Sequence, residues 1–415
     1  MGLGLAVSIS IGALASAPFS SGAAATPARI AKLGLCDYSN LAASNPSFVA
    51  SHFNSAVIGA ASTGTVSALH AVNPNLEVVG YLSSITTEVS VASSHPASSF
   101  LVDPQLQARL LSSSTGINEP HVPVYVMDPA SKTWQAEAAA AVSLAYARGE
   151  QGLLLDLVFG SLTELWPTAE PEGHANYQAV PSWYTDASWQ ASMKSFLKAT
   201  RKALGPKGTL AINGLAPLPG NPELTYAGLA SVAIEEGWAY DRRREAVSQS
   251  PYVTGSDWQR LLDTVLAAPA KTRITVQSYG PLDDPAARNY ALGSFLLAER
   301  KTWAYAYAPD CRTLTWFPEY GLDLGAPKGN AKSAADLTQV VPGVYDRRFT
   351  KGRVLVNPSA SDTATVALGQ TCTLQTPSGS TVAELGGDAT LSVSAVRSVT
   401  LGPHSAAIFT ACTKH

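Results

Sequence analysis

The feature that most constrains the fold of this 415-residue chain is a regular alternation of short apolar runs and helical stretches between residues 55 and 309. The runs are short and rich in Val, Ile, Leu, Ala and Tyr, as expected of buried strands, and cover residues 55–60, 77–82, 123–128, 152–158, 209–213, 231–235, 273–277 and 303–307. Strands that alternate with helices predict parallel strands joined by crossover helices. Because eight parallel strands can close a barrel, we expect a (β/α)₈ barrel of the α/β class.

The sequence pattern changes beyond about residue 343. Four short strand-like runs, at 354–357, 364–367, 390–393 and 406–409, are separated by Gly, Ser, Pro and Asn residues. This pattern predicts a small antiparallel, β-sandwich-like domain. The expected organisation is a signal peptide over 1–25, a barrel over 26–342 and a C-terminal β-domain over 343–415.

The first 25 residues predict export. An apolar segment from about Leu3 to Leu14 is followed by small residues, which is the pattern of a secretory signal. The segment is too short, and too often interrupted by Ser and Gly, to span a bilayer. We therefore expect a secreted or extracytoplasmic protein that does not span the membrane.

The chain has four cysteines: Cys36, Cys311, Cys372 and Cys412. They are too far apart in sequence for a CxxC zinc motif, and export favours disulfides. Three pairings are open. We favour Cys372 with Cys412, because both lie in the β-rich tail, and this choice leaves Cys36 with Cys311.

Charge and motifs exclude several classes of function. Lys and Arg total 28 against 31 Asp and Glu, a net charge of −3, so no basic field is present that would hold a nucleic acid. The histidines form no HxxxH or HxH pair, and no GxSxG, GxxxxGK[ST] or strand-linked GxGxxG motif occurs. We expect no metal and no organic cofactor.

Candidate reactive residues are carboxylates near the ends of predicted strands, where barrel enzymes place their chemistry. Asp156 interrupts the run 153–159, so its carboxylate must reach the barrel mouth or be buried at a cost of several kcal/mol. Glu235 and Glu236 end another run. Since side chains alternate along a strand, one of the two glutamates is expected to face the barrel axis.

Two carboxylates at one barrel mouth are what cleavage of a glycosidic bond requires. One carboxyl protonates the leaving oxygen, and the other attacks or activates water. Asp156 with Glu236 or Glu235 is therefore the catalytic candidate pair, with the order of roles open. Aromatic rings and polar groups at other strand ends suit sugar ring faces and hydroxyls; these candidate binding residues are Tyr81, Asp128, Asn213, Trp238, Gln277, Tyr279 and Tyr305, with Trp166, Trp183 and Tyr184 as further candidates in loops.

Several segments of the chain are similar to a known family. They are residues 73–81 (NPNLEVVGY), 152–156 (GLLLD), 234–238 (IEEGW), 288–297, 324–327 (LGAP), 345–349 (YDRRF) and 352–358 (GRVLVNP). Together they resemble glycoside-hydrolase-like family 15, which is related to the endo-α-1,4-polygalactosaminidase type of barrel. The resemblance implies a TIM-type barrel, a carbohydrate substrate and catalysis by acidic residues at Asp156 and Glu236. Its Glu-Gly-aromatic pattern favours Glu236 over Glu235.

The sequence thus predicts a secreted barrel glycosidase that acts on a polysaccharide or oligosaccharide. Two alternatives belong to other classes of protein, because barrels host many functions. A carbohydrate-binding barrel without turnover would keep its sugar affinity after Asp156→Asn or Glu236→Gln. A cell-surface structural protein would bind no oligosaccharide, and its Asp156 would lie in a closed ion-pair network.

Overall fold

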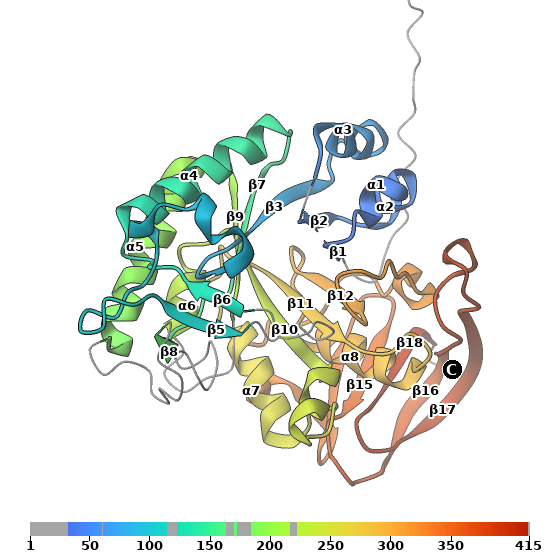
Figure 1. Cartoon of the computed structure of the whole chain (residues 1–415). Coiled ribbons are helices and arrows are strands. Elements are labelled where there is room, and N and C mark those ends of the chain that lie inside the picture. Colours follow the sequence, from blue (N-terminus) through green and yellow to red (C-terminus); the bar gives the residue numbers. More distant parts are fainter. Residues whose placement is uncertain are drawn as a thin grey trace, which may run out of the picture.

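The computed structural model describes residues 32–59, 61–113, 123–162, 170–171, 184–215 and 222–413. Eight parallel strands form a closed barrel in the order β1-β12-β11-β10-β9-β7-β3-β2 (Figure 1). These strands are β1 (Lys32–Asp37), β2 (Ser55–Ile58), β3 (Glu77–Ser83), β7 (Gly152–Asp156), β9 (Thr209–Asn213), β10 (Val232–Asp241), β11 (Arg273–Tyr279) and β12 (Ala304–Ala308). The predicted barrel is confirmed. The predicted signal segment 1–25 lies outside the described residues.

Helices cover the outside of the barrel (Figure 1). They are α1 (Leu41–Ser44), α2 (Pro46–His52), α3 (Thr63–Val72), α4 (Lys132–Ala147), α5 (Asp186–Leu204), α6 (Pro222–Ala227), α7 (Gly255–Leu266) and α8 (Pro285–Ala298). Most bury one apolar stripe, as α7 does with Trp258, Leu262 and Val265. None of the helices in the described ranges is long and apolar enough to cross a membrane.

One predicted barrel strand is misplaced. The run at 123–128 contains β6 (Pro123–Val126), which lies in a separate four-stranded sheet with β4 (Thr86–Glu88), β5 (Leu110–Ser113) and β8 (Glu170–Pro171). Strands β4, β5 and β6 form an excursion between β3 and α4, β8 joins them from the segment after β7, and all pairings in this sheet are antiparallel. The eighth barrel strand is β1, which joins β12 and β2 and so closes the barrel. Residue pattern alone does not distinguish the two sheets, because both need short apolar strands.

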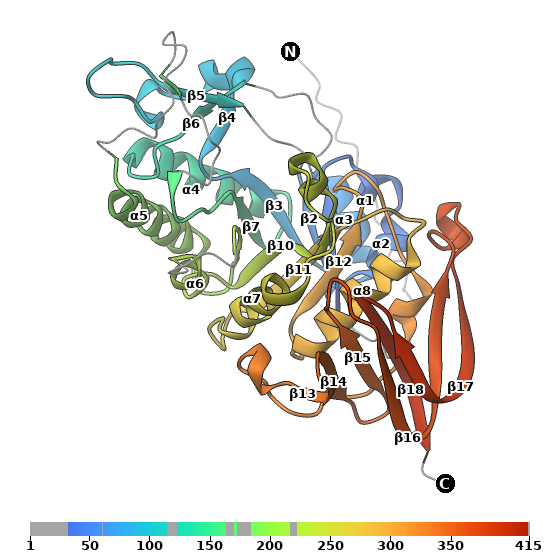
Figure 2. The same ribbon diagram turned by 90° about the horizontal axis from the view of Figure 1, so that it is seen from below.

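The C-terminal part forms one antiparallel sheet of six strands beside α8 (Figure 2). Its strands are β13 (Thr338–Val341), β14 (Val344–Arg348), β15 (Arg353–Asn357), β16 (Ala364–Ser378), β17 (Thr390–Leu401) and β18 (Ser405–Thr413). Helix α8 packs between barrel and sheet so closely that a Cβ at Gly293 would lie 2.5 Å from Cβ of Ala406. This contact joins the β-domain to the barrel. The antiparallel domain predicted from the sequence is confirmed.

Both predicted disulfides are present. Cys372 and Cys412 join β16 to β18, and Cys36 at the end of β1 pairs with Cys311, which follows β12. The second bridge spans 275 residues of sequence. It links the two strands at which the chain enters and leaves the barrel, so it holds the barrel seam closed.

Removing the seam disulfide is expected to destabilise the protein strongly. Replacing Cys36 and Cys311 together by Ala should lower the free energy of unfolding by about 2–5 kcal/mol, because the long loop is no longer closed in the unfolded chain. Urea unfolding of the double variant, monitored by tryptophan fluorescence, measures the change. Unchanged stability would show that the strand pairing of β1 with β12 holds the seam without the bridge.

Candidate active site

Asp156 ends β7 and accepts three hydrogen bonds. The Tyr81 hydroxyl on β3 donates to Oδ2 at 2.8 Å, and Nδ2 of Asn213 on β9 donates to Oδ1 at 2.7 Å. The backbone N–H of Leu157 donates to Oδ1 at 2.9 Å, and Leu157 has a left-handed φ of 59°. Such a conformation costs of order 1–3 kcal/mol in a branched residue and is typical of functional sites. Donors from β7 and from both neighbouring strands therefore fix this carboxylate.

The environment of Asp156 makes its ionisation less favourable. Burial and then the negative charge of Glu236 raise its pKa, and the hydrogen bonds from Tyr81, Asn213 and Leu157 lower it, so that the pKa is raised to about 6. Burial and a nearby like charge both disfavour the ionised form, whereas donated hydrogen bonds favour it. The two carboxylates therefore share one electrostatic environment.

Glu236 lies on β10 and has a different set of partners. The Tyr279 hydroxyl at the end of β11 donates to Oε1 at 2.9 Å, and Nη1 of Arg243 donates to Oε2 at 2.9 Å. The Glu236 side chain keeps 26% of its surface exposed. This carboxylate is thus anchored by one cation and one hydroxyl while remaining accessible from the cleft.

An irregularity in β10 brings Arg243 back to Glu236. The pairing of β10 with β11 shifts register between Glu236 and Asp241, and bulges of this kind re-aim side chains next to active sites. Gly237 has a φ of 83°, and a Cβ there would lie 2.7 Å from Oδ2 of Asp241, so glycine suits the position. Asp241 accepts from Nε of Arg243 at 2.8 and 3.0 Å, and the guanidinium lies 4.6 Å from the Tyr279 ring centre. Asp241 and Tyr279 thus hold Arg243 in place.

Glu235 points to the other side of the strand. Its side chain is buried, and its Oε2 has no hydrogen-bond partner among the described residues. Burial, the largest cause, raises its pKa well above the usual value, although the charge of Arg243 acts in the opposite direction. Glu236 lines the barrel cavity and Glu235 does not. The alternation of side chains along β10 therefore distinguishes the two glutamates.

The structure brings several other predicted residues into the site. Tyr81, Asn213 and Tyr279 each bond one of the two carboxylates. Gln277 is buried and lines the cavity below them. These four side chains extend from three strands, β3, β9 and β11, as expected of a barrel mouth.

Three predicted binding residues lie elsewhere. Trp238 is 1% exposed and donates from Nε1 to the carbonyl of Ala291 in α8. Tyr305 is fully buried and packs against Phe295 and Tyr320. Both point outward from their strands, into the layer between barrel and helices. Asp128 follows β6 in the excursion sheet and accepts from the N–H of Ala130 at 2.8 Å, so its predicted position at a barrel strand end is wrong.

Of the three aromatic residues predicted to bind sugar from loops, only Tyr184 lies in the part of the chain that the structure describes. Tyr184 donates to Ser192 at 2.9 Å beside α5. Trp166 and Trp183 lie outside the described residues.

Two residues of the site were missed from the sequence. Tyr38 follows β1, with its ring 4.9 Å from the ring of Tyr81 in an edge-to-face arrangement. Desolvation of its hydroxyl and then the charges of Asp156 and Glu236 raise its pKa well above the usual value. Tyr38 lines the same cavity as Glu236. The strand-end rule would have found Tyr38 once β1 was recognised. Arg243 carries no comparable signal, because only the fold brings it to Glu236.

In the part of the chain that the structure describes, no group of three or more His, Cys, Asp or Glu side chains could hold a metal ion. The polar groups at the barrel mouth are instead one carboxylate pair with tyrosine, asparagine and arginine partners. Such a set can hold and move a proton and can bond sugar hydroxyls.

A closed parallel barrel with two carboxylates at the carboxyl ends of its strands is the arrangement of a TIM-barrel protein of the glycoside hydrolase type. The model of one family covers residues 70–353 of the chain. The chain belongs to this family, described as hypothetical glycosyl hydrolase family 15.

Solved structures with a similar fold include several glycosidases. The glycoside hydrolase domain of PelA from Pseudomonas aeruginosa shares 18% identity with a TM-score of 0.47, covering 69% of this chain and 97% of that domain. The isomalto-dextranase of Arthrobacter globiformis, solved with panose, shares 12% identity with a TM-score of 0.47, covering 94% and 73%. Ega3 from Aspergillus fumigatus, solved with galactosamine, shares 11% with a TM-score of 0.40, covering 71% and 98%. No curated protein sequence matches the chain.

Proposed function

We propose that this protein is a glycoside hydrolase that cleaves the glycosidic bonds of a polysaccharide with Asp156 and Glu236 as its reacting pair. The observation that carries the proposal is the placement of two carboxylates at one barrel mouth, each held by its own partners. The charge of Glu236 is also one cause of the raised pKa of Asp156. Family membership supports a carbohydrate substrate.

The partners of the two carboxylates support distinct roles. Three hydrogen bonds hold Asp156 rigidly, and a pKa of about 6 leaves it mostly ionised at neutral pH. It therefore suits the group that attacks the anomeric carbon or activates water. Glu236 is the more accessible of the two and suits the residue that exchanges a proton with the leaving oxygen and with solvent.

The surrounding residues support sugar binding. Tyr38 and Tyr81 form an aromatic pair beside the carboxylates, and aromatic faces pack against the apolar faces of sugar rings. The amide of Asn213 and the hydroxyl of Tyr279 lie at the same barrel mouth and are groups that can bond sugar hydroxyls. An extracytoplasmic location fits the two disulfides, since such bonds persist in oxidising compartments.

The proposal is tested by release of reducing ends from a panel of galactosamine, glucosamine and neutral-sugar polymers. We expect release from at least one polymer by the wild-type protein. Release of reducing ends that persists in both Asp156→Asn and Glu236→Gln would rule out the carboxylate mechanism. Binding to a polymer without release would instead support a carbohydrate-binding barrel.

Arg243 is expected to contribute to the rate through Glu236. Arg243→Gln should lower kcat/KM by about 10- to 100-fold, the equivalent of a hydrogen bond to a charged group worth roughly 1.5–3 kcal/mol. Arg244→Gln is a matched control, because Arg244 bonds the carbonyl of Ser250 and faces Asp257. Equal losses in the two variants would show that the effect is not specific to the Glu236 contact.

A further inference from the structure

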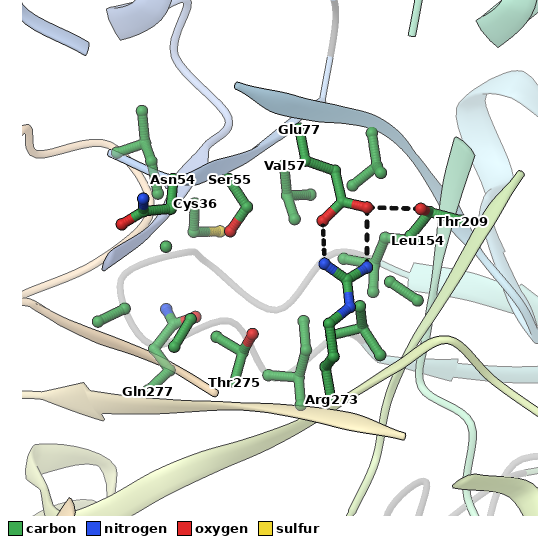
Figure 3. A pocket seen from close by; sticks show the side chains of 18 of the residues that line it. Cys36, Asn54, Ser55, Val57, Glu77, Leu154, Thr209, Arg273, Thr275 and Gln277 are labelled. Carbon is green, nitrogen blue, oxygen red and sulfur yellow. Dashed lines mark hydrogen bonds and ion pairs between the residues drawn. The ribbon is translucent and has the colours of Figure 1, made fainter. Parts of the chain in front are cut away.

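The barrel axis contains a cavity of about 450 Å³ that reaches from the carboxylate site toward the opposite end of the barrel. Figure 3 shows its open centre, with Ser55, Thr275 and Gln277 among the side chains around it. The interior of an eight-stranded barrel is normally filled by layers of branched side chains. An open axis is therefore a specific property of this chain.

Small side chains keep the axis open on one side. Gly34 on β1, Ser55 on β2, and Ala304 and Ala306 on β12 all line the cavity. On β2 the inward-pointing Ser55 and Val57 are partly accessible, whereas their outward-pointing neighbours Ala56 and Ile58 are 0% and 1% exposed. The inner face of this part of the barrel is thus more accessible than its outer face.

The two sides of the cavity differ in chemistry. Val79, Leu154 and Ile234 form an apolar wall on β3, β7 and β10. Facing it are the hydroxyl groups of Ser55 and Thr275 and the amide of Gln277. An apolar wall opposite hydroxyl and amide groups matches a pyranose ring, which has an apolar face and a rim of hydroxyls.

Gln277 is the buried polar group that most favours a ligand here. Gln277 is 5% exposed, and its amide nitrogen donates one hydrogen bond, to the Cys311 sulfur at 3.5 Å. A side-chain amide has two N–H donors and a carbonyl acceptor. The Gln277 amide therefore has donor capacity for a group inside the cavity.

The charges around the cavity are largely paired. At the amino-terminal end of the barrel, Arg273 donates to both oxygens of Glu77 at 2.6 and 2.8 Å (Figure 3). Lys32, at the same end, is exposed to solvent. At the other end Glu236 is paired with Arg243. This arrangement favours a polar ligand without a strong charge, and the volume lies within the roughly 300–1,000 Å³ of small-molecule sites.

We propose that this cavity binds one monosaccharide, directly below the carboxylate pair. The inference rests on the proposed function for the identity of the sugar as a unit of the cleaved glycan. Because Glu236 lines the cavity and Asp156 does not, a sugar there lies on the Glu236 side of the site. A monosaccharide bound in the cavity therefore acts as a product ligand of the enzyme.

The test is the affinity of the purified protein for galactosamine, galactose, glucosamine and glucose, measured by calorimetry and by ligand-observed NMR. We expect at least one of them to bind. Ala306→Leu, which fills the cavity, should weaken that binding by at least about 10-fold, since shape and volume decide occupancy of a preformed pocket. Ala140→Leu makes the same change on the exposed surface of α4 and should leave affinity unchanged.

A second variant separates cavity filling from misfolding. Thr275→Val keeps the side-chain volume and removes the hydroxyl. It should therefore weaken monosaccharide binding without changing the far-UV circular dichroism spectrum. Asp156→Asn should keep monosaccharide binding. No binding of any of the four sugars at tens of millimolar, or binding that is equal in wild type and Ala306→Leu, would overturn the inference.

These outcomes are independent of those for the proposed function. Polymer cleavage without monosaccharide binding would refute the cavity site alone. Cavity binding without cleavage of any polymer would refute the hydrolase alone.

Discussion

Asp156→Asn is expected to lower kcat/KM by at least about 10⁴-fold while making the folded protein more stable at neutral pH. The loss of rate follows because the amide of Asn neither attacks the anomeric carbon nor activates water. The gain in stability follows because burial and Glu236 raise the pKa of Asp156 from its ordinary 3.8 to about 6. The ionised carboxylate is thus held in the site at a cost in folding free energy.

The sign of the stability effect follows from proton linkage. A carboxyl with a raised pKa in the folded state binds protons more readily when folded, so its contribution is most favourable below pH 3.8 and is lost as the pH rises through about 6. The shift corresponds to about 3 kcal/mol. The stability of Asp156→Asn relative to wild type should therefore rise between pH 4 and pH 7.

Urea unfolding at several pH values, beside kinetics on the active polymer, checks both parts of this prediction. Asp128→Asn is the matched control, because Asp128 lies outside the barrel mouth after β6. It should keep full activity. A relative stability that is independent of pH would show that Asp156 has no raised pKa.

Glu236→Gln is expected to lower kcat/KM by about 10²- to 10⁴-fold, the usual contribution of a general acid or base. It should also lower the pKa of Asp156, because the charge of Glu236 is one of the two causes that raise it. In the wild-type protein kcat/KM should rise with pH through about 6, as Asp156 ionises. In the variant the same limb should move to lower pH.

Glu235→Gln provides the sharpest control for this prediction. It is the same substitution at the adjacent residue, but Glu235 is buried behind the strand, where its raised pKa favours the neutral form. An amide replaces a neutral carboxyl there with little change in shape, so activity should remain. A wild-type rate that falls above pH 6 would reverse the roles of Asp156 and Glu236.

Local patterns predicted most of the barrel. Seven of the eight predicted runs contain barrel strands, because buried parallel strands need continuous apolar residues whatever their partners. The remaining run, at 123–128, contains β6 of the separate sheet. The partners of a strand depend on where the chain returns and not on the residues of the strand alone. Strand β1 was missed, and with it Tyr38, whose ring pairs with Tyr81.

The candidate site divides in the same way. Asp156 stands out in the sequence because a carboxylate in an apolar run needs a reason to be there. Trp238 and Tyr305 are aromatic residues near strand ends, as Tyr279 is, yet they are buried beneath helices. The reason is that side chains alternate along a strand, and these two point away from the barrel axis. Arg243 reaches Glu236 only because β10 bulges after Gly237.

The sequence by itself determined the fold class and the position of Asp156 at the end of β7. Of three possible cysteine pairings it favoured the one that the structure contains. These features follow from local periodicity and from the few ways of pairing four cysteines. Only the tertiary structure decided which glutamate faces the axis, which aromatics reach the mouth and that the barrel is hollow. Those features depend on the register of the pleat and on contacts between residues far apart in the chain, which no local pattern contains.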